Sequence, residues 1–143
     1  MKYNFDQSIG RLAPIVSKKM GKSIVEKFQN SGYQITSDEW TIIAYLARYK
    51  IQNQNELAEV IGKDKVAVTR YISGLELMGY VEKEISDVDK RANYVKLTPL
   101  GKTTYKSLTK IVEEMLIEAY EDINKKDINT AIEVLNKIIS NLK

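Results

Sequence analysis

The amino-acid sequence predicts a mostly α-helical protein with a small β wing, a winged helix-turn-helix that carries a helical dimerisation region. Two short helical patterns follow each other directly over residues 53–79. Two strand patterns, separated by a charged turn, follow them over residues 81–97. Long amphipathic helical patterns flank this unit on both sides. At 143 residues the chain has the length of one domain.

Composition excludes several functional classes. The 143 residues include no cysteine and no histidine, which excludes thiol-based peroxide sensing, zinc sites of the Cys/His kind and Ser/His/Asp triads. We therefore expect no cofactor, no metal and no catalysis. The formal net charge is only +3, so any binding of nucleic acid must come from basic residues placed locally.

No segment predicts contact with a membrane. The longest apolar run, residues 42–47, is far too short to span a bilayer, and the first ten residues lack the apolar core of a signal peptide. The absence of cysteine fits a reducing compartment. We expect a cytoplasmic protein.

The N-terminal segment predicts two helices. The first runs from about residue 5 to residue 30, and Ser31-Gly32 ends its pattern. Its apolar stripe consists of Phe5, Ile9, Leu12, Val16, Met20, Ile24 and Phe28. The next helix begins at Thr36, where Glu39 completes a capping box and Ile35 can pack against Trp40. Trp40 is therefore expected in the core.

Residues 53–79 predict a helix-turn-helix. The first helix opens at Asn53 with Glu56 three places on, which resembles a capping box, and Gly62 ends it. Asp64 offers a carboxylate to the next helix start, and Gly79 stops the second helix. The expected buried positions are Leu57, Ala58 and Ile61 in the first helix and Val68, Ile72 and Leu75 in the second. In such a unit the start of the second helix lies against base edges in the major groove.

The start of this second helix holds the candidate DNA contacts. Four polar side chains can contact DNA: Lys63, Lys65, Thr69 and Arg70. The lysines can neutralise phosphates, the hydroxyl can donate to phosphate or base, and the guanidinium fork suits guanine or a phosphate pair. If Val66 and Ala67 face the groove, their apolar contacts fit the thymine methyl group and favour an A·T-rich site. In the alternative interpretation, Val66 lies in the core.

Residues 81–97 predict a β ribbon. The segments VEKEI and NYVKL alternate apolar and polar residues around the turn SDVDKRA. By itself this charged turn is most simply a solvated one. After a helix-turn-helix, however, we expect Lys90 and Arg91 to reach the minor groove or its phosphates. Asp89 is expected to orient Arg91 or cap the turn, because phosphate repels a carboxylate.

Two helices are expected after the ribbon. Thr98 and Pro99 form an N-cap and a first helical residue, and residues 124–126 break the pattern between the two helices. Their apolar stripes are Leu108, Ile111, Val112, Met115, Leu116, Ala119 and Ile123, then Ile128, Ala131, Ile132, Leu135, Ile138, Ile139 and Leu142. Both stripes are wider than a small core can cover, which favours a homodimer. We expect residues 1–34 and 99–143 to dimerise and residues 35–98 to form the winged lobe.

The chain also resembles the MarR-type (multiple antibiotic resistance regulator) winged-helix transcription factors over nearly all of its length. The resemblance rests on ITSDEWTIIAYLA, NELAEVIGKDKVAVTRYISGLELMGYV and DKRANYVKLTPLG, which match in order and spacing. The wing signature of the family falls on Asp89, Arg91 and residues 97–101. The resemblance implies a homodimer on a pseudo-palindromic operator in double-stranded DNA, which small anionic or phenolic ligands often release.

Such an effector should bind between the dimerisation helices and the winged lobe. Helix phase and the family resemblance together give five candidate lining residues: Leu12, Ile15, Trp40, Ile43 and Tyr105. We expect a transcriptional regulator, with repression favoured and activation left open.

Two other classes stay open. A hard-metal enzyme site could use the carboxylates Glu114, Glu118, Glu121 and Asp122, which share a helical face. A solvated face is the simpler interpretation, because nothing nucleophilic or phosphate-cradling accompanies them. Alternatively, the winged helix binds only another protein. The basic residues of the second helix and the wing argue against that alternative.

Overall fold

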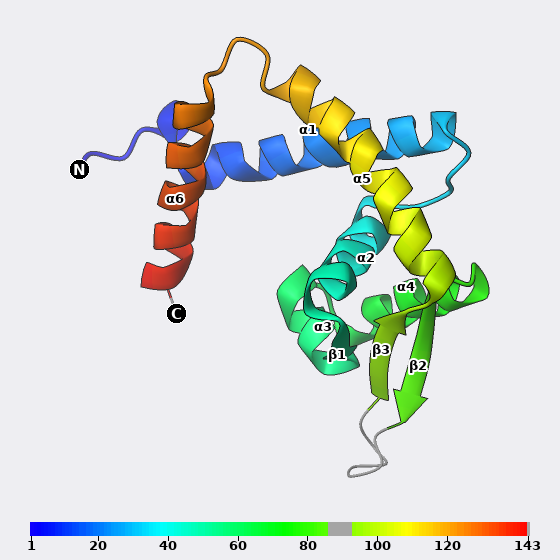
Figure 1. Cartoon of the computed structure of the whole chain (residues 1–143). Coiled ribbons are helices and arrows are strands. Elements are labelled where there is room, and N and C mark those ends of the chain that lie inside the picture. Colours follow the sequence, from blue (N-terminus) through cyan, green and yellow to red (C-terminus); the bar gives the residue numbers. More distant parts are fainter. Residues whose placement is uncertain (86–92, 143) are drawn as a thin grey trace.

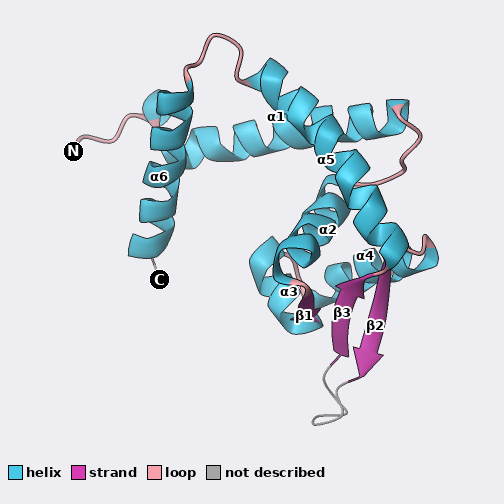
Figure 2. Ribbon diagram, in the orientation of Figure 1, coloured by secondary structure: helices cyan, strands magenta, loops and turns pink. Residues whose placement is uncertain are grey.

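The computed structural model describes residues 1–85 and 93–142. In chain order the elements are η1 (Phe5–Gln7), α1 (Ile9–Asn30), α2 (Ser37–Tyr49), β1 (Ile51–Asn53), α3 (Gln54–Ile61), α4 (Lys65–Leu77), β2 (Val81–Ile85), β3 (Asn93–Leu97), α5 (Pro99–Ala119) and α6 (Lys125–Asn141). A lobe contains α2, α3, α4 and the small sheet, whereas α1, α6 and the end of α5 extend away from it (Figure 1). Helices dominate the described residues (Figure 2), which confirms the expected fold class.

The wing strands form where the alternating patterns predict them. β2 and β3 pair antiparallel from Val81 opposite Leu97 to Ile85 opposite Asn93. The sheet has one strand more than the sequence predicts, because β1 pairs with the other edge of β3 and gives the order β1-β3-β2. With three residues, β1 is too short to show an alternating pattern, and backbone pairing with β3 holds it in place.

The core lies inside the lobe and under the end of α1. The expected apolar positions of α4 are completely buried, namely Val68, Ile72 and Leu75. Other buried side chains come from α1, α2, α3, β3 and α5, among them Phe28, Ile42, Ile43, Leu46, Leu57, Val95 and Leu108. Trp40 is partly buried, lies edge-on to Phe28 and stacks on Tyr105 with ring centroids 5.7 Å apart. It therefore packs against the core, as expected.

Side-chain caps fix the helix boundaries. Thr36 and Glu39 form the predicted capping box. The backbone N–H of Thr36 donates to the carboxylate of Glu39 at 2.9 Å, and the backbone N–H of Glu39 donates to the hydroxyl of Thr36 at 3.2 Å. Asp64 accepts a hydrogen bond from the backbone N–H of Ala67 at 2.8 Å. At the start of α3, Asn53 instead accepts from the N–H of Asn55, two positions on, at 2.7 Å. The capping box expected with Glu56 was wrong, because the side-chain oxygen of Asn53 accepts this short Asx-type hydrogen bond instead.

The start of α5 is locked against the end of α4. The hydroxyl of Thr98 accepts from the N–H of Gly101 at 3.0 Å and donates to the carbonyl of Gly79. The N–H of Thr98 donates to the carbonyl of Tyr80 at 3.0 Å. A Cβ at position 101 would lie only 2.0 Å from that carbonyl oxygen, so only glycine fits there. The LTPLG run thus joins the wing to α5 at a fixed position.

The apolar stripe of α1 is buried at one end only. Ile24 and Phe28 are buried, whereas Ile9, Leu12 and Val16 are exposed. On α6, which lies beside the beginning of α1 in Figure 1, no residue is buried. The intrachain core therefore leaves the stripe of α6 and the beginning of the stripe of α1 uncovered. At its other end α1 is tied to α5 by an ion pair of 2.8 Å between Lys27 and Glu118, and the hydrogen bond to Glu118 raises the pKa of Lys27.

No helix within the described ranges combines the length and the apolar character needed to cross a membrane.

Candidate nucleic-acid interface

Helix α4 presents one buried face and one exposed face. Val68, Ile72 and Leu75 fix the helix to the core. The exposed face near the start of α4 carries Lys65, Val66, Thr69 and Arg70. Because residues three and four apart share a helical face, these four side chains point away from the core together. The structure thus groups most of the predicted DNA contacts on a rigidly anchored surface.

Val66 is 78% exposed, which excludes the alternative that it belongs to the core. Ala67 is half-buried beside it. An exposed valine among cations at a helix start offers no hydrogen bond and can make only apolar contacts. The proposed contact with a thymine methyl group is compatible with this position.

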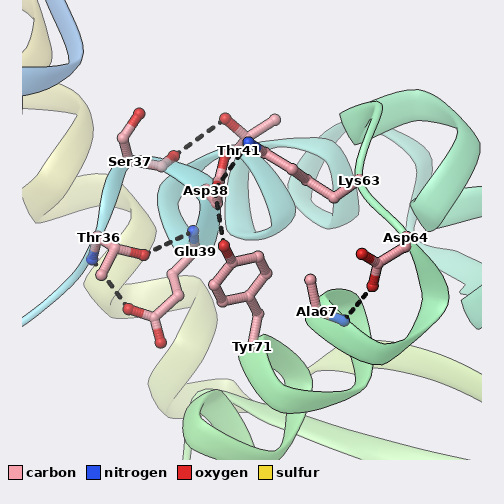
Figure 3. Close-up of polar contacts among 9 residues, drawn as sticks. All are labelled: Thr36, Ser37, Asp38, Glu39, Thr41, Lys63, Asp64, Ala67 and Tyr71. Carbon is pink, nitrogen blue, oxygen red and sulfur yellow. Dashed lines mark hydrogen bonds and ion pairs between the residues drawn. The ribbon is translucent and has the colours of Figure 1, made fainter. Parts of the chain in front are cut away.

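Lys63 and Tyr71 both contact Asp38, which comes from the first turn of α2 (Figure 3). The Tyr71 hydroxyl donates to Asp38 Oδ2 at 2.9 Å, and Lys63 Nζ lies 4.0 Å from the same oxygen. The half-exposed ammonium of Lys63 is therefore partly compensated by a carboxylate. Sequence reasoning missed Asp38 and Tyr71, because only the packing of α2 on α4 brings them together.

The hydroxyl of Thr69 is already engaged. It donates to the carbonyl of Lys65 at 2.8 Å and accepts from Gln54 Nε2 at 2.8 Å. The sequence led us to expect this hydroxyl to donate to phosphate or base. In the structure its hydrogen is directed at the carbonyl of Lys65 instead. Gln54, the first residue of α3, is another residue of this surface that the sequence did not reveal. Its polar side chain reaches from α3 to the exposed face of α4.

Arg70 is exposed, and its guanidinium carbon lies 5.6 Å from the centroid of the Tyr71 ring. Within residues 1–85 and 93–142, none of the ion pairs involves Arg70. Its full charge and planar fork are available to a ligand, and the Tyr71 ring restricts its position.

The wing residues Asp89, Lys90 and Arg91 lie outside the described residues. The strands on either side are held by backbone pairing and by ion pairs on their surface. Lys83 of β2 lies 3.8 Å from Glu76 of α4, and Lys96 of β3 pairs with Glu82 and Glu84 of β2. The ribbon is thereby fixed beside α4.

The five residues predicted to line an effector pocket do not share one cavity. Leu12 and Trp40 line a cavity of about 750 Å³ that is bounded by α1, α2 and α6. Tyr105 stacks on Trp40 but faces a second cavity of about 510 Å³. Ile43 is completely buried in the core, and Ile15 is exposed on α1 without lining the first cavity. Ile43 and Ile15 therefore line neither of these two cavities. Helix phase does not reveal which element covers a face.

The first cavity is apolar. Its polar side chains are the hydroxyls of Ser17, Ser37 and Thr41, and no charged residue lines it. Such a lining suits an uncharged or phenolic molecule better than an anion.

The carboxylates considered as a metal site do not form one. Among residues 1–85 and 93–142, no group of three or more acidic side chains is placed to hold a metal ion. Glu118 pairs instead with Lys27.

Comparison with known proteins agrees with this geometry. The model of the MarR family matches residues 33–92, from the segment before α2 to beyond β2. YdgJ, an uncharacterized HTH-type transcriptional regulator of Bacillus subtilis (strain 168), is 28% identical over 90 residues, which are 63% of this chain and 55% of that protein. The match thus spans about half the length of this curated relative.

Two solved structures are similar over nearly the whole chain. A mutant of MarR from E. coli complexed with operator DNA has a TM-score of 0.79 at 24% identity, covering 96% of this chain and 99% of that one. BpsR of Bordetella bronchiseptica, whose DNA binding is regulated by 6-hydroxynicotinic acid, also has a TM-score of 0.79, at 16% identity and with coverage of 96% and 97%. Their likeness shows the winged-helix fold. The model of the MarR family, a family of transcriptional regulators, matches residues 33–92, and the chain has the winged-helix fold of these structures.

Proposed function

We propose that this protein is a homodimeric repressor that acts in the cytoplasm on a pseudo-palindromic operator. The observation that carries the proposal is the exposed start of α4, where Lys65, Val66 and Arg70 stand on a helix whose opposite face is completely buried. A helix anchored in this way can enter the major groove without reorganising, so its side chains meet the bases in a fixed register.

The side chains at the start of α4 have different roles in the proposed recognition of DNA. Arg70 reads a base edge or clamps two phosphates, because none of the ion pairs among the described residues engages its fork and Tyr71 orients it. Lys65 contacts phosphate and sets position without base identity. Val66 favours thymine and hence an A·T-rich half-site. Lys63 contributes less to phosphate binding, since the carboxylate of Asp38 partly compensates its charge.

Dimerisation follows from the uncovered apolar surface. The exposed residues Ile9, Leu12 and Val16 of α1 and the stripe of α6 need a partner, and a second copy supplies the same surfaces across a two-fold axis. Residues 1–34 and 99–143 are the proposed dimerisation region. Two α4 helices would then meet half-sites about 10 base pairs apart. Repression is the simplest outcome, because a dimer that covers promoter DNA needs no further contact to block transcription.

A small effector is proposed to bind the first cavity. Leu12 and Val16 of α1 and Leu135 of α6 line this cavity and are also proposed to face the second copy, so the effector would share this surface with the partner. The cavity is also lined by α2, which contacts α4 through Asp38. A bound molecule can therefore change the separation of the two α4 helices. The hydroxyl-bearing, uncharged lining favours the phenolic over the anionic class of ligand. The regulation of the structural neighbour BpsR by 6-hydroxynicotinic acid supports the proposal.

Selection from random duplex DNA tests the DNA-binding proposal. We expect enrichment of an A·T-rich pseudo-palindrome whose half-sites lie about one helical turn apart. A shuffled duplex of the same composition is the control, and fluorescence anisotropy should show much weaker binding to it. Selection that enriches no sequence, with equal affinity for both duplexes, would favour the protein-binding alternative.

A further inference from the structure

The second cavity differs in chemistry from the first. It has a volume of about 510 Å³ and lies between the end of α2, the strands β1 and β3 and the start of α5. Its apolar lining consists of Leu46, Ala47, Ile51, Leu97 and Tyr105, and its charged lining of Lys50, Lys96, Lys102, Lys106 and Glu84. Four lysines and one carboxylate thus surround an apolar floor.

The floor is preformed by the core of the lobe. Leu46 and Leu97 are only 1% and 5% exposed, so both are fixed by packing. The ring of Tyr105 is backed by Trp40, which stacks on it at an interplanar angle of 11°. A ligand that enters this cavity would find rigid apolar walls and would not need to order them first.

The positive charge of the rim is only partly compensated. Glu84 pairs with Lys96, which Glu82 also approaches to 3.5 Å, and the hydrogen bond from Lys96 to Glu84 raises the pKa of Lys96. Within the described ranges, no ion pair involves the other three lysines, Lys50, Lys102 and Lys106.

The positions of these three lysines concentrate positive charge at the rim. Lys102 and Lys106 are one turn apart on α5, and like charges at this spacing repel. Lys50 ends α2 at a φ of 70°, a conformation that favours glycine. A lysine there costs backbone strain but places an ammonium group at the rim.

We propose that this cavity binds a carboxylate anion with an apolar body. The apolar body lies against Leu46, Leu97 and Tyr105, and the carboxylate meets the ammonium groups of Lys102 and Lys106, with Lys50 across the rim. The volume is within the range of roughly 300 to 1,000 Å³ that is usual for small-molecule sites. The site uses neither the exposed face of α4 nor the first cavity, so it stands whether or not the proposed function holds.

Octanoate is the probe for this site, and octanamide is its uncharged counterpart. In titration calorimetry of the full-length protein, octanoate should bind and octanamide should bind at least about tenfold more weakly, because only the anion gains the ammonium contacts. Trp40 is the only tryptophan, and its fluorescence should change on titration through its contact with Tyr105.

Variants localise the binding. The double variant Lys102→Gln with Lys106→Gln should lose octanoate affinity about tenfold, whereas Lys110→Gln, an exposed lysine two turns after Lys102 that does not line the cavity, should retain it. Ala47→Met fills space without changing charge and should also weaken binding. Equal binding of octanoate and octanamide, or wild-type affinity in the folded double variant, would overturn the proposal. Failure of octanoate to bind the wild-type protein would do the same.

Discussion

The hydroxyl of Tyr71 donates a hydrogen bond of 2.9 Å to Asp38, and this contact joins the recognition helix to a helix that begins 28 residues earlier. Asp38 lies between Ser37 and Thr41 on α2, and both of these line the first cavity. The contact therefore connects the proposed effector site with the proposed DNA-binding face. A molecule that moves α2 would move α4 with it.

Tyr71→Phe should lower the free energy of unfolding by about 1 kcal/mol, because it removes a partly buried hydrogen bond to a carboxylate. Urea denaturation measures the change. Tyr33→Phe is the matched control, since Tyr33 is also half-buried and none of the described side-chain hydrogen bonds involves its hydroxyl. Equal stabilities of the two variants would show that the bond to Asp38 contributes nothing.

Arg70→Ala should lower affinity for the selected operator by about 1 to 3 kcal/mol while the protein remains folded. The reason is the loss of the planar fork from the exposed face of α4. Fluorescence anisotropy measures the affinity, and circular dichroism confirms folding. Lys19→Ala, which removes an exposed cation from α1, should bind nearly as the wild type does. An Arg70→Ala protein with unchanged affinity would remove this residue from the interface.

Arg91→Ala tests the wing, which lies outside the described residues. An arginine inserted into a narrow A·T-rich minor groove gains from its strong negative potential. Affinity should therefore fall most on operators with A·T-rich flanks and least where G·C pairs replace those flanks. Arg91→Lys should recover only part of the loss, since ammonium is more strongly hydrated and lacks the fork. Equal losses of affinity on operators with A·T-rich flanks and with G·C flanks would indicate that Arg91 contacts phosphate without reading groove shape.

Gly101→Ala should destabilise the protein by about 2 kcal/mol or more, because its Cβ would collide with the carbonyl oxygen of Tyr80 at 2.0 Å. Thermal unfolding measures the loss. Gly10→Ala is the contrasting variant: its Cβ would meet only Ser8 Oγ at 3.6 Å, so the better helix propensity of alanine should leave stability equal or higher. A Gly101→Ala protein as stable as wild type would mean that the α5 start can shift freely.

Leu135→Glu should dissociate or unfold the protein, because it places a charge in the apolar stripe proposed to be covered by a second copy. Asn136→Glu adds the same charge at the next position, outside the stripe, and should leave assembly intact. Sedimentation at micromolar concentration distinguishes monomer from dimer. A folded wild-type monomer at that concentration would contradict the proposed dimer.

Local patterns predict the elements and caps of this fold well. The capping box at Thr36, the cap at Asp64 and the buried face of α4 each depend on residues three or four apart, so the sequence displays them directly. Strand β1 could not be predicted, because backbone pairing with the distant strand β3 forms it and no side-chain pattern marks it.

The functional surface could be predicted only in part. Exposure of Val66 and Arg70 follows from helix phase. The bonds from Tyr71 to Asp38 and from Gln54 to Thr69 join residues 33 and 15 positions apart, and only tertiary packing sets them. The five predicted effector residues do not line one shared cavity for the same reason, since the helix that covers a given face is not encoded in the periodicity of that face.

The dependence of duplex binding on salt tests the central claim most directly. We predict that affinity for the selected operator falls steeply and linearly in a double-logarithmic plot, since phosphate contacts release counterions. Lys65→Ala should make the slope shallower by about one unit on operator and shuffled duplex alike, because a phosphate contact carries no base identity. A wild-type protein whose binding is absent or independent of salt would contradict the account.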